Sequence, residues 1–481
     1  MELEKIFIDI PIEKIHGSFD CSVSHMTLDS RDVRGDSIFV AIKGDKSDGH
    51  VFIDLAIQSG ALMIICSVMP EKIHENITYV CISNIERFIG VIASRFYGHP
   101  SETLKVIGVT GTNGKTTIAT LLYKAVGHLG KKAGLISTIE NYVCEKVLQT
   151  SNTTPDAITI QRLFREMINA GCEYCFMEVS SHALVLGRVN GIKFHGGIFT
   201  NLTLDHLDFH KTLSNYLEAK KLFFDMLPQG AFALVNSDDE ATAKLTRDTK
   251  ATISTYALLK DAFYKGEIKE LVFPKMAFEI NGLQGNFKLV GDYNAYNILA
   301  IYGTLQILGF EPNKSIQIIE RLDGARGRFE ILVSKLGAIA IIDYAHTPDG
   351  LQNVLKTISN INQNKHSIIT VFGCGGDRDR TKRPLMTEIA LRYSNKVIVT
   401  TDNSRSENPE NIIADMVATL AEKTNIEIIL DRSLAIATAV KSLQSGDIVL
   451  IAGKGHEMYQ DIKGLKTHFS DREEVEKIFT F

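Results

Sequence analysis

Lys105-Val-Ile-Gly-Val-Thr-Gly-Thr-Asn-Gly-Lys-Thr-Thr117 is the stretch of sequence that decides the fold. Residues 105–110 are rich in β-branched side chains, which predicts a buried strand, and apolar residues recur at helical spacing from Ile118 to Leu129. A strand, a glycine-containing loop and a helix in this order are typical of a phosphate-binding P-loop. The sequence therefore predicts a nucleotide-binding domain.

The loop residues are suited to triphosphate chemistry. Backbone N–H groups of the loop can surround a phosphate, Lys115 can reach the β- and γ-phosphate oxygens, and the Thr116 hydroxyl can bind Mg²⁺. The strict P-loop pattern has glycine where this chain has Val109, and we expect Gly108 and Gly111 to compensate. The expected nucleotide-binding loop residues are Gly111, Thr112, Asn113, Gly114, Lys115, Thr116 and Thr117.

On both sides of this loop, strand-like and helix-like segments alternate, which predicts α/β domains with parallel sheets. The 481 residues are enough for about three domains of roughly 150 residues. Gly98-His-Pro100 is typical of a turn, and residues 321–328 are typical of a linker. We therefore expect three domains, formed by residues 1–102, 103–328 and 329–481.

Composition excludes several classes of protein. The chain has 52 basic and 57 acidic residues, and its net charge of -5 gives no support to nucleic-acid binding. No apolar run approaches the ~18 residues that span a bilayer, and the N-terminus lacks the pattern of a signal peptide. Seven cysteines, including Cys172 and Cys175, are too few for a disulfide framework, and we expect a reduced, cytoplasmic protein.

Polar residues downstream of the loop could form a metal site. Glu178 ends an apolar run and could supply a second ligand to Mg²⁺. His206 and His210 could form a zinc pair on a helix, but no third ligand follows at a suitable spacing. A switch GTPase is disfavoured, because the guanine-binding Asn-Lys-x-Asp pattern is absent from the sequence.

The loop Gly111–Thr116 resembles the ATP-binding loop of the Mur ligases, the ADP-forming enzymes that add amino acids to the peptidoglycan precursor. Met177-Glu-Val-Ser-Ser-His182, Asp205-His-Leu-Asp208 and Tyr216-x-x-Ala-Lys220 are similar to further motifs of the family and follow in the same order. The resemblance implies that Lys220 is carbamylated and that the catalytic residues are Lys115, Glu178, His206 and Lys220. It also implies Mg²⁺ ligands at Thr116, Glu178, His206 and Lys220.

The same resemblance implies further contacts with substrates. Asn294 and Asn297 match the family's adenine-side residues, and Arg328, Asp343 and His346 match residues that reach the nucleotide when the third domain closes. The uridine-nucleotide residues would be Leu28, Ser30, Asp45, Lys46 and Ser47. The peptidyl residues would be Asn152, Thr153, Thr154, Ser180 and Arg188, with Leu186 where the family often has Gln.

Within the family, the chain is most similar to the enzymes that add the third residue of the stem peptide. Asp402-Asn-Ser-Arg405 is similar to the Asp-Asn-Pro-Arg signature of the members that add meso-diaminopimelate, with Ser404 in place of proline. Arg405 would hold the distal carboxylate of that substrate, and Glu457 its distal ammonium. The implied amino-acid pocket comprises Arg378, Asp402, Asn403, Ser404, Arg405, Gly453 and Glu457.

The resemblance thus implies an α/β enzyme with a uridine-nucleotide domain, a central P-loop ATPase domain with a parallel sheet, and a Rossmann-like amino-acid domain. It would use ATP and Mg²⁺ to join meso-2,6-diaminopimelate to the D-Glu of UDP-N-acetylmuramoyl-L-Ala-D-Glu through an acyl phosphate, in cell-wall synthesis. We expect a cytoplasmic monomer with no nucleic-acid partner and no membrane insertion. The alternatives are a lysine-adding ligase of the same family, a folylpolyglutamate synthetase, and a P-loop switch protein.

Overall fold

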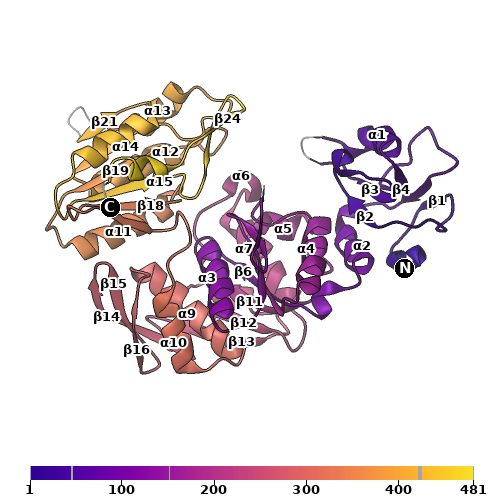
Figure 1. Ribbon diagram of the computed structural model, residues 1–481, viewed down its shortest axis with the longest axis horizontal. Helices are drawn as coiled ribbons and strands as arrows, with labels where there is room; N and C mark the ends of the chain where they lie inside the picture. The colour runs from indigo at the N-terminus through magenta and orange to yellow at the C-terminus, as the bar shows by residue number, and fades with distance from the viewer. Residues whose placement is uncertain (1, 45–46, 151, 421–424, 480–481) are drawn as a thin grey trace.

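The chain forms three units, each built on one main β-sheet, in a computed structural model that describes residues 2–44, 47–150, 152–420 and 425–479 (Figure 1). The α/β class is confirmed, since the three main sheets consist largely of parallel strands. In the described part of the chain, no helix combines the length and the apolar character that a membrane span requires.

The N-terminal unit has a five-stranded sheet in the order β1-β5-β4-β3-β2, and only β1 runs antiparallel to its neighbour. The apolar runs at residues 37–42 and 60–66, with a helical pattern between them, predict two strands and a helix, and these are confirmed as β3, α1 and β4. The elements are η1 (Leu3–Phe7), β1 (Lys14–His16), β2 (His25–Thr27), η2 (Ser30–Asp32), β3 (Ser37–Ala41), η3 (Gly49–Phe52), α1 (Ile53–Gln58), β4 (Ala61–Cys66), β5 (Thr78–Cys81), η4 (Ile85–Arg87) and α2 (Ile89–Phe96).

The central unit has an eleven-stranded sheet in the order β16-β15-β14-β13-β12-β11-β6-β10-β7-β8-β9. Its first elements are η5 (Pro100–Glu102), β6 (Lys105–Thr110), α3 (Lys115–His128), β7 (Ala133–Ile136), β8 (Asn141–Val143), β9 (Lys146–Leu148), α4 (Ala157–Asn169), β10 (Tyr174–Glu178), α5 (Ser181–Val185) and β11 (Phe194–Phe199). The remaining elements are α6 (Leu207–His210), α7 (Leu213–Asp225), β12 (Phe232–Asn236), α8 (Thr242–Leu245), β13 (Thr252–Ala257), β14 (Tyr264–Val272), β15 (Lys275–Ile280), β16 (Leu283–Phe287), α9 (Asp292–Ile307) and α10 (Pro312–Arg321).

Strand β6 lies in the middle of this sheet, between β10 and β11, and is parallel to both. Helices α3, α9 and α10 contribute to a large apolar core on one face, while α4, α5 and α7 contribute to a second core on the other face. The P-loop strand is therefore buried on both faces, as expected for a parallel sheet. The loop after β6 opens at the carboxyl edge of the sheet, where α/β proteins bind ligands.

The C-terminal unit has a six-stranded sheet in the order β17-β18-β22-β19-β20-β21, and a separate hairpin formed by β23 and β24. Apolar runs at residues 338–343, 367–372, 396–400 and 447–452 predict four strands, and these are confirmed as β18, β19, β20 and β22. The elements are β17 (Glu330–Val333), β18 (Ile339–Asp343), α11 (Pro348–Asn362), β19 (Ile368–Phe372), α12 (Lys382–Tyr393), β20 (Lys396–Val399), α13 (Pro409–Val417), β21 (Ile426–Ile428), α14 (Arg432–Lys441), β22 (Ile448–Ala452), β23 (Tyr459–Ile462), β24 (Leu465–His468) and α15 (Asp471–Glu476).

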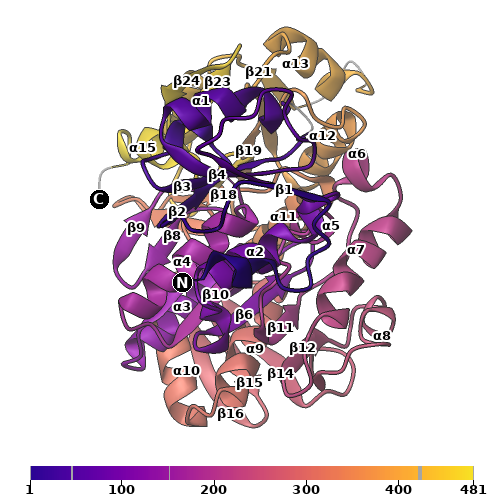
Figure 2. The ribbon, with the colours of Figure 1, turned by 90° about the vertical axis from the view of Figure 1, so that its right-hand side faces the viewer.

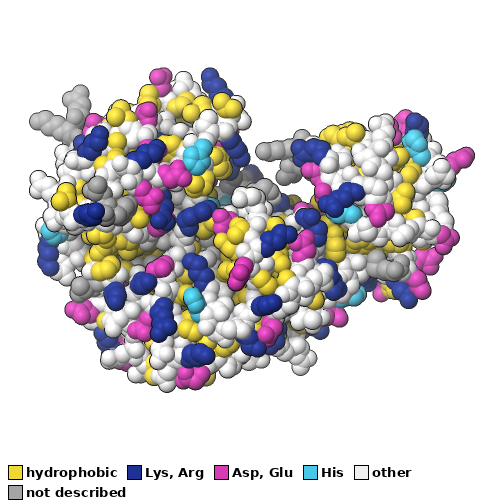
Figure 3. All heavy atoms as spheres, viewed as in Figure 1, with side chains coloured by type: hydrophobic (Ala, Val, Ile, Leu, Met, Phe, Trp, Pro, Cys, Tyr) yellow, Lys and Arg dark blue, Asp and Glu magenta, His cyan; other side chains and the backbone are white. Residues whose placement is uncertain are grey.

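The N-terminal unit packs on the central unit through α2 and α4. The contact is close, because a Cβ atom at Gly90 would lie 2.1 Å from the carbonyl oxygen of Asn190. In Figure 3 a hollow separates the N-terminal unit from the C-terminal unit, above the central unit. Figure 2, which looks onto the N-terminal unit, places α13 and β16 at opposite ends of the molecule, as Figure 1 also does.

Candidate active site

The loop between β6 and α3 depends on two glycines. Gly111 has φ +144° and a Cβ there would lie 1.8 Å from Oγ1 of Thr200, while Gly114 has φ +90°. Gly108 lies within β6 instead, where a Cβ would lie 2.5 Å from the ring of Phe223. The expectation that Gly108 replaces the missing P-loop glycine is therefore wrong, because this residue allows the close packing of α7 on the sheet.

Two lysines meet at this loop, Lys115, which is half-buried, and Lys220, which is buried. Lys115 Nζ donates hydrogen bonds to the carbonyl oxygens of Gly111 and Thr112, at 2.9 and 2.7 Å. Lys220 Nζ donates to the Gly111 carbonyl at 2.8 Å and lies 4.2 Å from the ring centroid of Tyr216. Burial, and then the charge of Lys115, lower the pKa of Lys220 well below its usual range. Lys220 is therefore placed to hold a neutral amine, the form that reacts with CO₂.

Glu178, the last residue of β10, lies beside the phosphate loop because β10 pairs with β6 in a register that sets it opposite Val109. Its carboxylate accepts a hydrogen bond from the Thr116 hydroxyl at 3.0 Å and another from the backbone N–H of Thr138 at 2.7 Å. The side chain is fully buried. A carboxylate and a hydroxyl at this edge of the sheet are oxygen ligands of the kind that Mg²⁺ prefers.

His206 lies just before α6, as its N-cap residue, and is close to an acidic neighbour. Its Nε2 is 3.5 Å from the carboxylate of Asp205, and its ring centroid is 4.9 Å from that of His182. Burial lowers the pKa of His206 to about 4. His210 contacts the Ser181 hydroxyl at 2.9 Å. Across the described residues, no three His, Cys, Asp or Glu side chains are arranged to hold a metal ion, so the zinc alternative gains no support.

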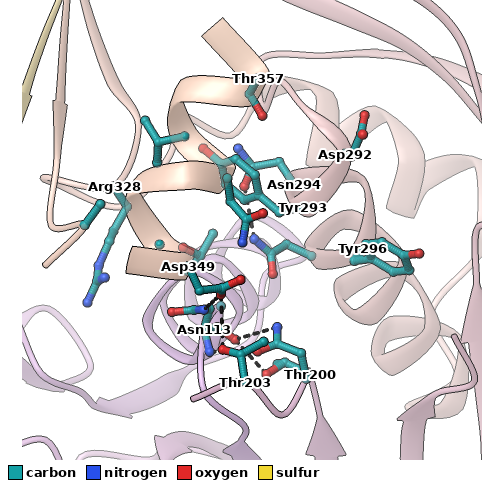
Figure 4. A pocket seen from close by; sticks show the side chains of 18 of the residues that line it. Asn113, Thr200, Thr203, Asp292, Tyr293, Asn294, Tyr296, Arg328, Asp349 and Thr357 are labelled. Carbon is teal, nitrogen blue, oxygen red and sulfur yellow. Dashed lines mark hydrogen bonds between the residues drawn. The ribbon is translucent and has the colours of Figure 1, made fainter. Parts of the chain in front are cut away.

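Two neighbouring cavities adjoin the loop. The larger, of about 350 Å³, is lined by Asn113, Tyr293, Asn294, Asn297, Arg328, Asp343, His346 and Asp349, among others (Figure 4). The smaller, of about 150 Å³, is lined by the whole loop 111–117 together with Thr138, Thr153, Glu178, Ser180, Asp205, His206, Tyr216 and Lys220. The two cavities meet where the start of the C-terminal unit faces the loop, because both are lined by Arg328, Tyr344 and His346 and by Asn113, Gly114 and Thr117.

The C-terminal unit already contacts the phosphate loop in this conformation. Asp349, near the start of α11, accepts hydrogen bonds from Nδ2 of Asn113 at 2.8 Å and from the Thr203 hydroxyl at 3.1 Å, as Figure 4 shows. Arg328 Nη2 donates to the Thr116 hydroxyl at 3.2 Å. The approach that we expected from closure of the third domain is therefore present in this conformation.

The nucleotide-side residues expected from the sequence differ in what they do. Asp343 accepts hydrogen bonds from the N–H groups of Phe329 and Ala345, both at 2.7 Å, and thereby fixes the turn on either side of the linker. Asn297 donates to Oδ1 of Asn294 at 3.0 Å. Burial, and then the charge of Lys382, lower the pKa of His346 to about 4. Asp343, Asn294, Asn297 and His346 all line the larger cavity.

The expected peptidyl residues gather at the end of β10. The Thr154 hydroxyl donates to the backbone carbonyl of Glu178 at 2.8 Å and accepts from the N–H of Ser180 at 3.1 Å. Arg188 donates to the carbonyl of Thr154 at 3.1 Å. Leu186, in the place of the family's Gln, ends α5 and is 39% exposed. Thr153 and Ser180 line the smaller cavity, and Asn152 lies in the same segment.

The expected amino-acid residues lie on three loops of the C-terminal unit. Arg405 has φ +50° and its Nη1 donates to the carbonyl of Gly376 at 2.6 Å. A Cβ at Gly453 would lie 2.7 Å from the carboxylate of Asp402, so those two loops also touch. Arg378 is exposed at the end of the loop that follows β19. None of these residues lines the two cavities in the described part of the chain.

Ser404 is the residue at which the amino-acid signature of this chain departs from that of the family. Ser404 is buried, and its hydroxyl has no hydrogen-bond partner among the described residues, which fits a position where the family has proline.

The expected uridine-nucleotide residues lie in the N-terminal unit. Ser30 is buried at the start of η2, Leu28 is half-buried and Ser47 is exposed. Asp45 and Lys46 lie outside the described residues.

Sequence reasoning missed several contacts. Asp349 follows Thr347 and a proline after β18, a helix-start pattern that could have drawn attention to it. Asp205 is the first residue of the motif Asp205–Asp208, and the sequence assigns it no role. In the structure it faces His206 and Lys115. Cys172 and Cys175 are buried core residues, and Sγ of Cys172 lies 3.1 Å from Sγ of Cys144, a contact that no spacing in the sequence indicates.

A P-loop whose phosphate side is closed by a second α/β unit defines a nucleotide-dependent enzyme of the ligase type. Comparison with known families agrees: residues 22–97 match the Mur ligase family catalytic domain, residues 109–305 the Mur ligase middle domain, and residues 327–455 the Mur ligase glutamate ligase domain. The chain belongs to the Mur ligase family.

Individual relatives match over their whole length. The chain is 47% identical to the UDP-N-acetylmuramoyl-L-alanyl-D-glutamate--2,6-diaminopimelate ligase of Phocaeicola vulgatus, covering 100% of this chain and 99% of that protein. It is also 47% identical to the ligase of the same name from Parabacteroides distasonis, again over 100% and 99%. A solved structure of a ligase with this name is 32% identical, with a TM-score of 0.69 and coverage of 99% and 98%.

Proposed function

We propose that this chain is an ADP-forming ligase that joins meso-2,6-diaminopimelate to the D-Glu of UDP-N-acetylmuramoyl-L-Ala-D-Glu. The observation that carries the proposal is the end-to-end similarity, at 47% identity, to relatives named for that reaction. These relatives favour this function over the lysine-adding, folylpolyglutamate and switch-protein alternatives. A folylpolyglutamate synthase structure from Thermotoga maritima is only 17% identical and shares the fold alone.

The larger cavity fits ATP. Its volume of about 350 Å³ falls within the usual range of small-molecule pockets, roughly 300–1,000 Å³. The Tyr293 hydroxyl and Nε of Arg328 are buried at its wall and have no hydrogen-bond partner among the described residues. Buried polar groups are normally satisfied, so a polar ligand would complete both. We assign Asn294 and Asn297 to the adenine side, and Arg328, Asp343 and His346 to the ribose and phosphate side.

The smaller cavity fits Mg²⁺ and the reacting phosphate. The Thr116 hydroxyl and the Glu178 carboxylate are hydrogen-bonded to each other, and Lys220 and His206 line the same space. Mg²⁺ usually takes only one or two carboxylates and completes its shell with phosphate oxygens and water, so a sparse protein ligand set is suitable. We assign Thr116, Glu178, His206 and carbamylated Lys220 as its ligands. Bound there, Mg²⁺ would neutralise phosphate charge.

The residues of the loop would then position the phosphoryl group. Backbone N–H groups of 111–117 and the ammonium of Lys115 would hold the β- and γ-phosphates while the D-Glu γ-carboxylate attacks the γ-phosphorus and ADP leaves. The segment 152–154, Ser180 and Arg188 would hold the peptidyl end against the loop. The amine of the amino acid then attacks the acyl phosphate, releasing phosphate and forming the amide.

The three units would divide the substrates between them. We assign residues 1–102 to the uridine nucleotide through Leu28, Ser30 and the loop 45–47, residues 103–328 to ATP, and residues 329–481 to the amino acid. Because ATP and uridine-linked precursors are cytoplasmic metabolites, we propose a cytoplasmic location.

An amino-acid panel tests the proposal. Phosphate release is measured with ATP, Mg²⁺ and UDP-N-acetylmuramoyl-L-Ala-D-Glu, and with meso-diaminopimelate, L-lysine or no amino acid. We expect release that depends on both the uridine dipeptide and meso-diaminopimelate. Equal or better turnover with L-lysine would favour the lysine-adding alternative, and release indifferent to amino acid would favour a switch protein.

A further inference from the structure

The loop after β22 contains a lysine that is buried without contacting either cavity. Lys454 is 0% exposed, and its Nζ donates hydrogen bonds to Oδ1 of Asn403 and to Oε2 of Glu457, both at 3.1 Å. Asn403 Nδ2 donates to the same Oε2 at 2.7 Å. Lys454, Asn403 and Glu457 therefore form a closed hydrogen-bonded triad, whose other two members belong to the proposed amino-acid pocket.

The triad determines which way the amide of Asn403 faces. Oδ1 of Asn403 accepts from Lys454 and from the backbone N–H of Asp461, the latter at 2.9 Å. Since an ammonium and an N–H can only donate, the carbonyl end must point to them and the NH₂ end to Glu457. The backbone N–H of Glu457 also donates to the carbonyl of Lys454 at 3.0 Å, which closes the turn. Lys454 thus fixes the side chains of Asn403 and Glu457.

The triad also sets the charge of Glu457. Burial raises the pKa of this carboxyl group, Asp402 raises it further, and Lys454 and Asn403 oppose the increase. The other charged or titratable groups facing Glu457 are Tyr344 after β18, Tyr459 on β23 and Arg432 on α14. Of all the groups that face Glu457 in the described part of the chain, Lys454 is the only cation in direct contact with the carboxylate.

We propose that Lys454 is a positioning residue of the amino-acid pocket, which orients Asn403 and keeps Glu457 a carboxylate that can bind the distal ammonium of the substrate. Both bonds within the triad use Oε2, so the triad itself leaves Oε1 to the substrate. This inference rests on the proposed function, because Glu457 and Asn403 are assigned there as substrate contacts.

A purely structural lysine would behave differently. Its loss would weaken the fold or disturb all substrates together, whereas loss of a positioning residue acts on one substrate and changes a pH profile. Without Lys454 the pKa of Glu457 rises, so the carboxylate exists only at higher pH. The KM for the amino acid should then increase as the pH falls through this raised pKa, and recover at alkaline pH.

The test compares Lys454→Met with wild type in the full-length enzyme, measuring KM for the amino acid, ATP and the uridine dipeptide across the neutral and alkaline range. We expect the KM for the amino acid to rise on the order of 10- to 100-fold at neutral pH, with the other two unchanged. The increase should shrink at alkaline pH. An increase that is the same at every pH, or shared by all three substrates, would overturn the proposal.

Lys466→Met is the matched control, because both ammonium groups approach the ring of Tyr459, Lys454 at 5.5 Å and Lys466 at 4.4 Å, but Lys466 is exposed. If Lys454→Met does not fold, the double variant Lys454→Met/Glu457→Gln removes both buried charges and is compared with Glu457→Gln alone. KM values for the amino acid that are independent of pH in both variants support the proposal, and a pH dependence that persists in the double variant contradicts it. A wild type without any amino-acid dependence would instead reject the proposed function.

Discussion

Lys220 and Lys115 donate hydrogen bonds to the same acceptor, the carbonyl oxygen of Gly111, at 2.8 and 2.9 Å. Lys220 is 1% exposed and Lys115 is half-buried, so two ammonium groups here would repel each other with little solvent screening. Conversion of Lys220 to a carbamate replaces a like charge with an opposite one. The arrangement therefore favours the modification that the family resemblance implies.

Lys220→Ala should abolish ligase activity, because it removes the carbamate that we assign as a Mg²⁺ ligand. Short carboxylates such as acetate should restore part of the activity by occupying the vacated space. Phosphate release with and without added acetate measures both effects. The control is Lys221→Ala, whose ammonium pairs with Asp225 and Asp248 and not with the loop. Full activity in Lys220→Ala would rule out the carbamate role.

Glu178→Gln should raise the Mg²⁺ concentration needed for half-maximal activity by at least about tenfold, since an ionised ligand is exchanged for a neutral one. Titration of activity with MgCl₂ measures the shift. Glu173→Gln is the control, because Glu173 lies just before β10 and forms an exposed ion pair with Lys131. An unchanged Mg²⁺ requirement in Glu178→Gln would remove this residue from the metal site.

Most of the fold could be predicted from local patterns. The strands β3, β4, β6, β18 and β22 are short apolar runs with turns at both ends, and such signals are contained in the sequence itself. Gly108 was misjudged for a different reason. Whether a glycine serves a loop or a close helix contact depends on the ring of Phe223, which comes from α7 more than a hundred residues later.

The candidate site was predictable only where residues are consecutive. The loop 111–117 and Glu178 follow from strand ends, but the contact of Asp349 with Asn113 joins two units and depends on how they pack. Lys454 is similar, since its burial follows from the approach of the loop at Asn403. A solvated lysine and a buried one have the same sequence signal, and only tertiary packing separates them.

Arg432→Met should destabilise the C-terminal unit by about 3–5 kcal/mol. Arg432 and Asp471 are both 0% exposed at the side chain and form a two-bond pair, at 2.7 and 2.8 Å, so the substitution leaves a buried carboxylate without its counter-charge. Urea unfolding monitored by circular dichroism measures the change. Arg472→Met is the control, because its pairs with Glu330 and Glu476 are partly exposed and should be worth at most about 1 kcal/mol. Similar losses in both variants would contradict the argument.

Arg405 should determine which amino acid is used. Diaminopimelate and lysine differ by one distal carboxylate, and a guanidinium can bind this group through two charge-assisted hydrogen bonds. The bond from Nη1 of Arg405 to the carbonyl of Gly376 fixes the side chain beside the loop 373–378. Glu407 does not compete for it, because its carboxylate is bound by the fully buried Arg383 at 2.8 and 3.0 Å.

We therefore expect Arg405→Ala to lower kcat/KM for meso-diaminopimelate by about 30–150-fold, equivalent to about 2–3 kcal/mol, while KM for ATP and the uridine dipeptide stays the same. In the wild type, L-lysine lacks the carboxylate that Arg405 would bind, and its distal ammonium would face Arg405 as a like charge. Both effects disfavour lysine as a substrate. Arg380→Ala, which removes an exposed pair with Asp415 near the same loop, is the control. A wild type that prefers lysine, or an Arg405→Ala variant that keeps the diaminopimelate preference, would show that selectivity resides elsewhere in the C-terminal unit.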